Sequence, residues 1–262
     1  MDNRNQLTVI ILAAGEGTRL RPYTLDRPKC LVEVDGQSLL DRQLAVLAKE
    51  SVSNVVLIGG YRVDMLGRQG VTLRINPKYA ETNMVSTLFC ADGDLEGDVL
   101  VSYGDIVYSR HTLRAVLNSV ADIAVAIDMD WESYWRARNE DPLDDAETLK
   151  LGSDGRILEI GQKPKSIVEI QGQYMGLMKF SATGIQMLKK VFRDASAIGK
   201  LRGKPIEKAY MTDLLQAMID LGYKLNSVPV HGGWIEVDTV SDLTSHITKN
   251  RLAQIVKELD GK

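Results

Sequence analysis

The sequence predicts an α/β fold built on a doubly wound, mainly parallel (mixed) sheet. Two observations predict this class. Short apolar runs rich in β-branched residues recur along the first half of the chain, as in strands that are buried on both faces. Segments with apolar residues at helical spacing separate most of these runs. Strands that alternate with helices are typical of a parallel sheet with helices on both faces.

The first half of the chain carries the clearest elements. At its most regular helix, Leu40, Leu44 and Leu47 share one face, and Ser38 and Asp41 have the spacing of a capping box at the start. The expected helices cover residues 38–50, 83–91 and 111–120, and the expected strands cover residues 8–14, 54–58, 71–75, 98–102 and 122–127.

The second half has a different texture. An aromatic and charged segment, WESYWRARNEDPLDDAE, begins at Trp131 and leads into shorter elements. Thr239 and Asp242 have capping-box spacing at the start of a last amphipathic helix, expected from about Val240. We expect this half to elaborate the sheet and to form a small C-terminal lid. Its other expected elements are strands over residues 148–151, 156–160, 174–180, 224–230 and 234–237, and helices over residues 181–192 and 205–221.

Composition excludes several classes of function. The chain has 262 residues, and its net charge is −3, so no overall basic field draws it to nucleic acid or to an anionic membrane. Residues 1–6 are polar, and the apolar run over residues 7–14 is too short to span a bilayer, so neither a signal peptide nor a membrane span is predicted. Cys30 and Cys90 form no disulfide framework and have no metal-site spacing. We expect a cytoplasmic protein.

The loop after the first strand is unusual. Gly15 and Gly17 precede four cations, which are Arg19, Arg21, Arg27 and Lys29. Glycines after a strand allow backbone N–H groups to approach phosphate oxygens, and cations neutralise the negative charge. The third glycine of a dinucleotide fingerprint and the Gly-Lys-Ser/Thr of a Walker A loop are both absent. The loop therefore predicts an anion site, with an ordinary glycine turn and solvated cations as the alternative.

Several segments in this order resemble the signature of the nucleotidyltransferases that make NDP-sugars and CDP-alcohols. They are ILAAGEGTRLRP, RPKCLVEVDGQSLLDRQL, NPKYAETNMVSTLFCA, YGDI and WIEVDT, spread over about residues 8–240. The third segment and QGQYMGLMKFS are similar to the branch acting on phosphocholine and aminoethylphosphonate. The resemblance implies a Rossmann-like fold and one nucleotidyltransferase domain over residues 1–262. Within it, residues 7–128 would bind the nucleotide and residues 129–240 the acceptor, with a C-terminal helix over residues 241–262.

The resemblance also implies roles for the loop residues. Arg19 and Lys29 would hold the triphosphate as catalytic cations, with Lys29 near the reacting phosphorus. The nucleotide would be bound by Leu12, Ala13, Ala14, Gly15, Gly17, Thr18, Asn83 and Ser86.

Three carboxylates are candidates for a magnesium site. Mg²⁺ binds one or two carboxylates together with phosphate oxygens. Asp105 follows an expected strand, and Glu236 and Asp238 share one face of another strand at i, i+2 spacing. The resemblance places the metal on Asp105 and Asp238 with Glu236 close by. The alternatives are a turn-forming Asp105 and a helix-capping Asp238.

The acceptor side departs from the pattern that is usual in members that use sugar phosphates. Members that use sugar phosphates usually show Glu-Lys-Pro where this chain has Gln162, Lys163 and Pro164. Lys163 would still hold the acceptor phosphate, but the missing carboxylate argues against a hexose. Tyr174 is a further expected acceptor-binding residue.

An aromatic face is a candidate site for an ammonium group. Trp131, Tyr134 and Trp135 fall at i, i+3 and i+4, on one side of a helix. Trp131 and Trp135 would enclose the cation. In the alternative, this face only packs the lid on the domain. Arg136 and Arg138 leave open an acceptor carboxylate instead.

We therefore expect a Mg²⁺-dependent cytidylyltransferase that moves CMP from CTP to a small phosphorylated alcohol or amine, an amino-acid phosphate or a phosphonate, releasing pyrophosphate. The alternatives are a sugar-1-phosphate nucleotidylyltransferase that uses another NTP and a non-catalytic nucleotide-sensing subunit. The expected partners are the nucleotide and the acceptor, with neither nucleic acid nor membrane. A homodimer stays open.

Overall fold

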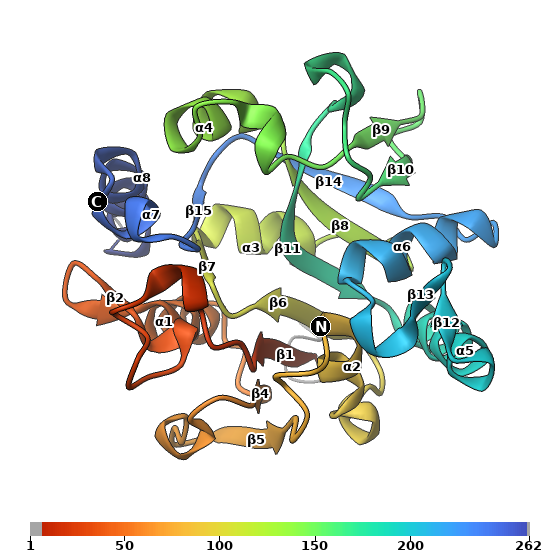
Figure 1. Ribbon diagram of the computed structural model, residues 1–262, viewed down its shortest axis with the longest axis horizontal. Coiled ribbons are helices and arrows are strands. Elements are labelled where there is room, and N and C mark those ends of the chain that lie inside the picture. Colours follow the sequence, from red (N-terminus) through yellow and green to blue (C-terminus); the bar gives the residue numbers. More distant parts are fainter. Residues whose placement is uncertain (1–6, 261–262) are drawn as a thin grey trace.

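A computed structural model describes residues 7–260, and a seven-stranded sheet runs through its centre (Figure 1). β11 is antiparallel to both of its neighbours, β6 and β8, while every other neighbouring pair in this sheet is parallel. The prediction of a mainly parallel, mixed sheet is confirmed. In spatial order the strands are β14 (Asn226–Val230), β8 (Ile123–Asp128), β11 (Gln173–Phe180), β6 (Val99–Tyr103), β1 (Thr8–Ala13), β4 (Val55–Gly59) and β5 (Val71–Ile75).

Helices cover both faces of the sheet, because successive side chains of a strand point to opposite faces. Ile10 and Leu12 of β1 pack in one core with α2, α5 and α6, whereas Val9 and Ile11 pack in another with α1, α3 and α4. All six residues of β1 are buried, as the continuous apolar run predicts. The helices are α1 (Leu39–Lys49), α2 (Met84–Phe89), α3 (Arg110–Leu117), α4 (Trp131–Arg138), α5 (Ala182–Ile198), α6 (Met211–Asp220), α7 (Val240–Thr244) and α8 (His246–Asp260).

A third, smaller core lies beside the sheet. Leu20 and Val32 of the N-terminal loop pack there with Ile235, Leu243 and other apolar residues of β15, α7 and α8. Figure 1 shows α7, α8 and the C-terminus gathered on the left, next to β15. The two-stranded pairs are β15 (Trp234–Glu236) with β7 (Ile106–Tyr108), β9 (Leu149–Leu151) with β10 (Ile157–Ile160), β12 (Lys200–Leu201) with β13 (Lys204–Pro205), and β2 (Glu33–Val34) with β3 (Gln37–Ser38).

The expected last helix is interrupted. Its capping box forms as predicted between Thr239 and Asp242, but α7 ends at Thr244. Ser245 adopts an extended conformation, and its hydroxyl accepts a hydrogen bond from the N–H of Ile247 at 3.2 Å. Ser245 therefore satisfies a free N–H at the start of α8, so the chain forms two helices in place of one.

No helix within residues 7–260 is both long and apolar enough to cross a bilayer. Residues 1–6, for which no signal peptide is expected, and residues 261–262 of the expected C-terminal helix lie outside the described part of the chain.

The sheet topology brings two distant segments together at the carboxyl ends of β1 and β6. The N–H of Gly104 donates to the carbonyl of Leu12 at 2.9 Å, which ties the end of β6 to β1. The N–H of Val237 donates to the carbonyl of Asp105 at 3.0 Å, next to the pairing of β15 with β7. Asp238 therefore lies beside Asp105, although many residues separate them in sequence. Ligands of doubly wound sheets bind at this edge.

Gly104→Ala tests this close approach. A Cβ atom at Gly104 would lie 2.8 Å from the carbonyl oxygen of Leu12, a backbone atom that cannot turn aside. We expect the melting temperature to fall by roughly 5 °C, because an added methyl group in a packed site costs about 1–3 kcal/mol. Gly93→Ala is the control, since nothing lies within 4 Å of its Cβ position. Equal melting temperatures for the two variants would contradict the packing argument.

Candidate active site

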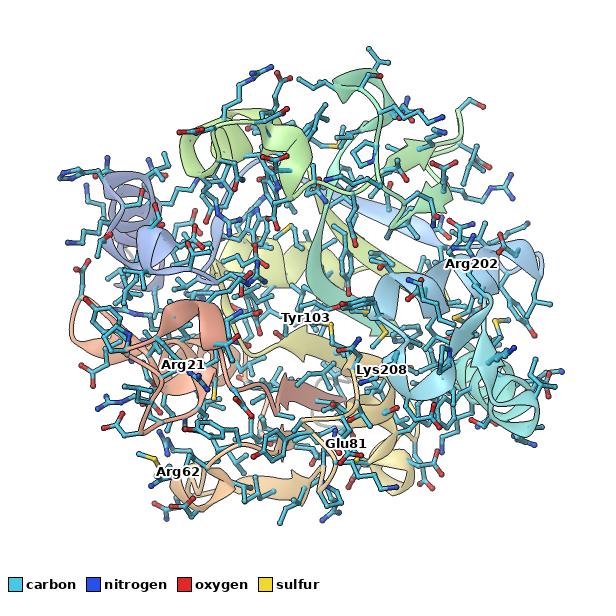
Figure 2. All side chains as sticks on the ribbon, in the orientation of Figure 1. Arg21, Arg62, Glu81, Tyr103, Arg202 and Lys208 are labelled. Carbon is cyan, nitrogen blue, oxygen red and sulfur yellow. The ribbon has the colours of Figure 1, made fainter. Side chains whose placement is uncertain are left out.

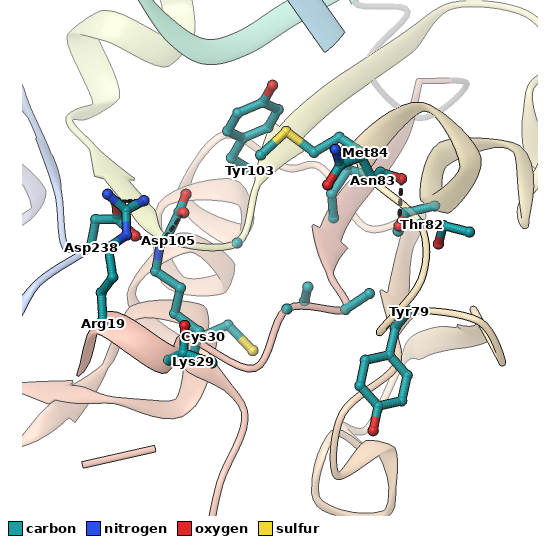
Figure 3. A pocket seen from close by; sticks show the side chains of 18 residues that line it. Arg19, Lys29, Cys30, Tyr79, Thr82, Asn83, Met84, Tyr103, Asp105 and Asp238 are labelled. Carbon is teal, nitrogen blue, oxygen red and sulfur yellow. Dashed lines mark hydrogen bonds and ion pairs between the residues drawn. The ribbon is translucent and has the colours of Figure 1, made fainter. Parts of the chain in front are cut away.

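A cavity of about 270 Å³ opens at the carboxyl ends of β1 and β6 (Figure 3). It brings together the loop after β1, the loop before α2 and the two aspartates. Of the residues expected to bind nucleotide, metal or phosphate, those that line it are Leu12, Ala13, Ala14, Gly15, Gly17, Thr18, Arg19, Lys29, Asn83, Asp105 and Asp238. The remaining lining residues are Cys30, Tyr79, Thr82, Met84, Thr87, Tyr103 and Gly104.

Lys29 is the electrostatic centre of this cavity. Its Nζ donates to Asp105 Oδ2 at 2.5 Å and to Asp238 Oδ1 at 2.7 Å. The side chain is only 14% exposed. Burial alone would lower the pKa of Lys29, but the two carboxylates outweigh burial and raise this pKa. Lys29 therefore stays positively charged and holds three segments of the chain together.

The local backbone places Lys29 there. Gly17 has φ 67°, and a Cβ on it would meet the Lys29 side chain at 3.0 Å. Lys29 begins the short 3₁₀ helix Lys29–Leu31, and the buried Leu31 anchors this turn in the core. Burial raises the pKa of the neighbouring Cys30 thiol to about 12, so Cys30 is a packing residue.

The other loop cations divide into two kinds. Arg19 lines the cavity and forms an ion pair with Asp238. Arg21 instead pairs with Glu16 at 3.3 Å, and Arg27 pairs with Asp26 at 3.1 Å, all outside the cavity. Figure 2 labels Arg21 on the N-terminal loop, away from Tyr103 at the centre of the molecule. Two of the four cations are thus available to an anionic ligand in the cavity.

Asp105 and Asp238 form a fitting pair for a hard divalent cation. Both carboxylates reach one Lys29 ammonium, so they lie close to each other. Asp105 Oδ1 is buried and has no hydrogen-bond partner, although buried polar atoms are usually paired. Within residues 7–260, no group of three His, Cys, Asp or Glu side chains is arranged to hold a metal. Two carboxylates that are completed by phosphate oxygens suit Mg²⁺.

Glu236 lies close to this pair, as the resemblance implies, but its carboxylate is bound to another side chain. Its Oε2 accepts from Arg138 Nη1 at 2.8 Å, and the same guanidinium holds Asp242 at 2.8 Å through Nε. Burial raises the pKa of Glu236, and the charges of Asp105 and Asp238 act in the same direction, against Arg138. Glu236 therefore lies beside the aspartate pair, but it is bound to its own arginine, Arg138.

A second cavity, of about 170 Å³, adjoins the first. Arg19, Met84, Tyr103 and Asp238 line both, so the two cavities meet at these side chains. The expected acceptor residues Trp135 and Tyr174 line the second cavity, as does Glu236. Its other lining residues are Asp145, Glu147, Gln173, Met175, Gly176, Tyr210 and Thr212.

The aromatic face of α4 is mostly buried, which favours the packing alternative over the predicted ammonium box. Trp131 and Trp135 are 4% and 3% exposed, and Trp131 lines neither cavity. The guanidinium carbon of Arg138 lies 5.1 Å from the ring centres of both Tyr134 and Trp135. This face therefore already binds a cation of its own chain. Packing is its main role.

Two further residues that were expected to bind a substrate, Lys163 and Ser86, line neither cavity. The ammonium of Lys163 donates to the carbonyls of Leu143 and Asp144, so it supports a loop beside the second cavity without lining it. Ser86 lines neither cavity, because α2 turns Met84 and Thr87 toward the first one, and residues two apart do not share a face.

Several lining residues were missed from the sequence. Tyr103 and Gly104 could have been found, because they belong to the YGDI segment that supplies Asp105. In contrast, Gln162 lines neither cavity, although its replacement of the usual glutamate was the argument against a hexose. Tyr79 and Thr82 belong to the NPKYAETNMVSTLFCA segment and Gln173 to QGQYMGLMKFS, but roles for these three side chains were not predicted. The others lie in segments with no recognised signal, and they are Asp145, Glu147, Tyr210 and Thr212.

Glu147 is a carboxylate of the second cavity whose pKa is raised. Burial raises its pKa to about 7, and the negative charges of Asp213, Asp145 and Glu236 add to this effect. The hydroxyl of Thr212 lies 3.5 Å away and opposes the shift only weakly. Near neutral pH this carboxyl is therefore only partly ionised, and its ionised form is unfavourable in the cavity wall.

Glu147→Gln should therefore stabilise the protein in a pH-dependent way. A carboxyl whose pKa is raised from 4.5 to about 7 costs nothing well below pH 4.5. Its cost grows as the pH rises from 4.5 to about 7 and stays constant at higher pH. We expect the gain in melting temperature to be roughly 5 °C larger at pH 8 than at pH 5. The matched control is Asp144→Asn, an exposed carboxylate of the same loop. A gain that does not depend on pH would contradict this account.

Comparison with known proteins places the chain in a family. The model of the MobA-like NTP transferase domain matches residues 9–178. A CTP:phosphoglutamine cytidylyltransferase of Campylobacter jejuni is 36% identical over 257 residues, which are 93% of this chain and 100% of the relative.

Solved structures share the fold. A CTP:phosphocholine cytidylyltransferase from Streptococcus pneumoniae is similar with a TM-score of 0.72 and 22% identity, over 96% of this chain and 99% of that one. An inositol-1-phosphate CTP transferase from T. maritima gives a TM-score of 0.72 and 22% identity, over 96% of each chain. With its cationic glycine-containing loop and paired aspartates at the carboxyl edge of such a sheet, the chain belongs to the family of MobA-like NTP transferase domains and is a nucleotidyltransferase.

Proposed function

We propose that this enzyme transfers CMP from CTP to a small phosphorylated acceptor, with phosphoglutamine as the first candidate, and releases pyrophosphate. The observation that carries the proposal is the junction of two cavities at Arg19 and Asp238, with Lys29 and Asp105 on the nucleotide side. The Campylobacter jejuni relative, similar over its whole length, supports CTP and phosphoglutamine as substrates.

The geometry suits an in-line displacement at the α-phosphorus of the nucleotide. A phosphate oxygen of the acceptor attacks this phosphorus, a new P–O bond forms, and the bond to the β-phosphate oxygen breaks, so pyrophosphate leaves with the electron pair. The acceptor phosphate is largely dianionic near pH 7 and needs no general base. Lys29 and Arg19 supply positive charge next to the reacting group, and such pre-positioned charge stabilises the transition state.

We further propose Mg²⁺ as the metal, held by Asp105 and Asp238. When bound, it would neutralise charge on the phosphate oxygens. Lys29 and Arg19 together balance the charges of the two carboxylates, so the pair can be buried without an uncompensated charge.

The proposed division of labour follows the two cavities. Residues 7–128 supply almost all of the first cavity, and residues 129–240 supply most of the second. A sugar-1-phosphate nucleotidylyltransferase is not favoured, since the full-length relative acts on phosphoglutamine. A non-catalytic sensor is also disfavoured, because Lys29, Asp105 and Asp238 are present and in mutual contact.

The proposal is tested by measuring pyrophosphate release with CTP, UTP, ATP or GTP against phosphoglutamine, phosphocholine, aminoethylphosphonate, glycerol phosphate and glucose 1-phosphate. We expect CTP with phosphoglutamine to give the highest kcat/KM. Asp105→Asn and Asp238→Asn should each lose more than about 100-fold in kcat at saturating Mg²⁺, because electrostatic stabilisation of this kind is worth that much. A highest rate with glucose 1-phosphate, or near-normal rates in both variants, would refute the assignment.

The loop cations give a sharper comparison. Lys29→Ala should lower kcat by more than roughly tenfold, because a charge next to the reacting phosphorus acts mainly in the transition state. Arg21→Ala removes an exposed cation of the same loop, paired only with Glu16, and should stay within about twofold. Steady-state kinetics on both variants, with melting temperatures, separates catalysis from stability. Equal losses of kcat at the two positions would mean that the loop is misassigned.

A further inference from the structure

The second cavity has an unbalanced charge. Four of its lining residues are carboxylates, and only Arg19 is a cation. Glu236 is paired with Arg138, and Asp238 is paired with Lys29 and Arg19. This leaves the two carboxylates of the loop before β9, which are Asp145 and Glu147. No lysine, arginine or histidine within residues 7–260 forms an ion pair with either of them.

Glu147 bears most of this imbalance. Asp145 is exposed and can be solvated, whereas Glu147 is partly buried between Ala146 and Thr148, which are both buried. Its hydrogen-bond partner is the Thr212 hydroxyl, at the long distance of 3.5 Å. A carboxylate that is withdrawn from water without a cation is costly. The chain nevertheless places it in the wall of a cavity, where a ligand can compensate it.

Two neutral side chains of the same cavity are also incomplete. Trp135 and Gln173 are each 3% exposed, and both line the cavity. Trp135 Nε1 and Gln173 Oε1 have no hydrogen-bond partner. Buried polar atoms are paired in most folded proteins, so an unpaired donor and an unpaired acceptor in one cavity wall indicate a ligand with complementary groups.

We propose that Glu147, with Asp145 beside it, binds an ammonium group of the acceptor and makes the enzyme selective for amine-bearing acceptors. This inference rests on the proposed function and assigns the acceptor class within it. Trp135 Nε1 would donate to an acceptor oxygen, and Gln173 Oε1 would accept from an acceptor N–H. An amino-acid head group, which has both an ammonium and a carboxylate, matches this set of charges and hydrogen-bonding groups.

An acceptor without an ammonium group would bind less tightly beside Glu147. A hydroxyl in place of the ammonium could donate one hydrogen bond to Glu147, but it would leave the carboxylate charge uncompensated. Hydrogen bonds to charged groups are worth more than neutral ones, so the amine should bind more tightly by about 10-fold or more. The selectivity therefore depends on the charge of Glu147.

Two matched pairs of acceptors test this selectivity. One pair is phosphoglutamine and the same compound with its α-ammonium replaced by hydrogen. The other is phosphoethanolamine and 2-hydroxyethyl phosphate. Dissociation constants are measured by calorimetry on the wild-type enzyme, Glu147→Gln and Asp144→Asn. Each measurement contains Mg²⁺ and the CTP analogue with a methylene group between the α- and β-phosphorus, which cannot react. Because no turnover is needed, this test is separate from the pyrophosphate-release screen.

The wild-type enzyme should bind the ammonium member at least about 10-fold more tightly in one or both pairs. Glu147→Gln should reduce this ratio to within about 3-fold, while Asp144→Asn, an exposed carboxylate of the same loop, should leave it unchanged. Glu147→Gln removes an unfavourable buried charge, so the variant is expected to fold. The inference is overturned if the wild-type enzyme shows no preference in either pair, or if the preference survives in Glu147→Gln. Turnover with neutral acceptors would then leave the transferase function standing.

Discussion

The contact of Lys29 with Asp105 and Asp238 is the interaction on which the rest of the site depends. It joins the loop after β1, the end of β6 and the segment after β15, which come from the start, the middle and the end of the chain. Two carboxylates this close would repel each other strongly in a desolvated setting, and one buried ammonium removes that cost. The same charges serve the proposed chemistry, because phosphate oxygens and a divalent cation need cations and carboxylates at one place.

The two cavities differ in whether their carboxylates have cationic partners. Around the first cavity, the two aspartates have cationic partners within the chain, which suits the metal and phosphate proposed for it. In the second cavity, no cation of the described residues pairs with Glu147, which suits the proposed ammonium ligand. Arg19 lies where the cavities meet, and its position at this junction suits a contact with the phosphates of both substrates.

The aromatic cluster of α4 supports the site from behind. Arg138 is almost fully buried, stacks on Tyr134 and Trp135, and holds both Glu236 and Asp242. Through Asp242, which caps α7, it fixes the segment that supplies Asp238. The concentration of aromatic residues is thus explained largely by the need to bury an arginine that orients two carboxylates.

The sequence by itself determined the class of the sheet, its buried strands, and the glycine-containing loop that carries Lys29 and Arg19, because these features are contiguous and follow local periodicity or a linear motif. Resemblance added Asp105 and Asp238. Only the tertiary structure decided the acceptor side. Whether a carboxylate such as Glu147 has a partner, or an aromatic such as Trp131 faces a ligand or the core, depends on segments far apart in the chain. Ion pairing and burial are set by that packing, and no spacing within one segment records it.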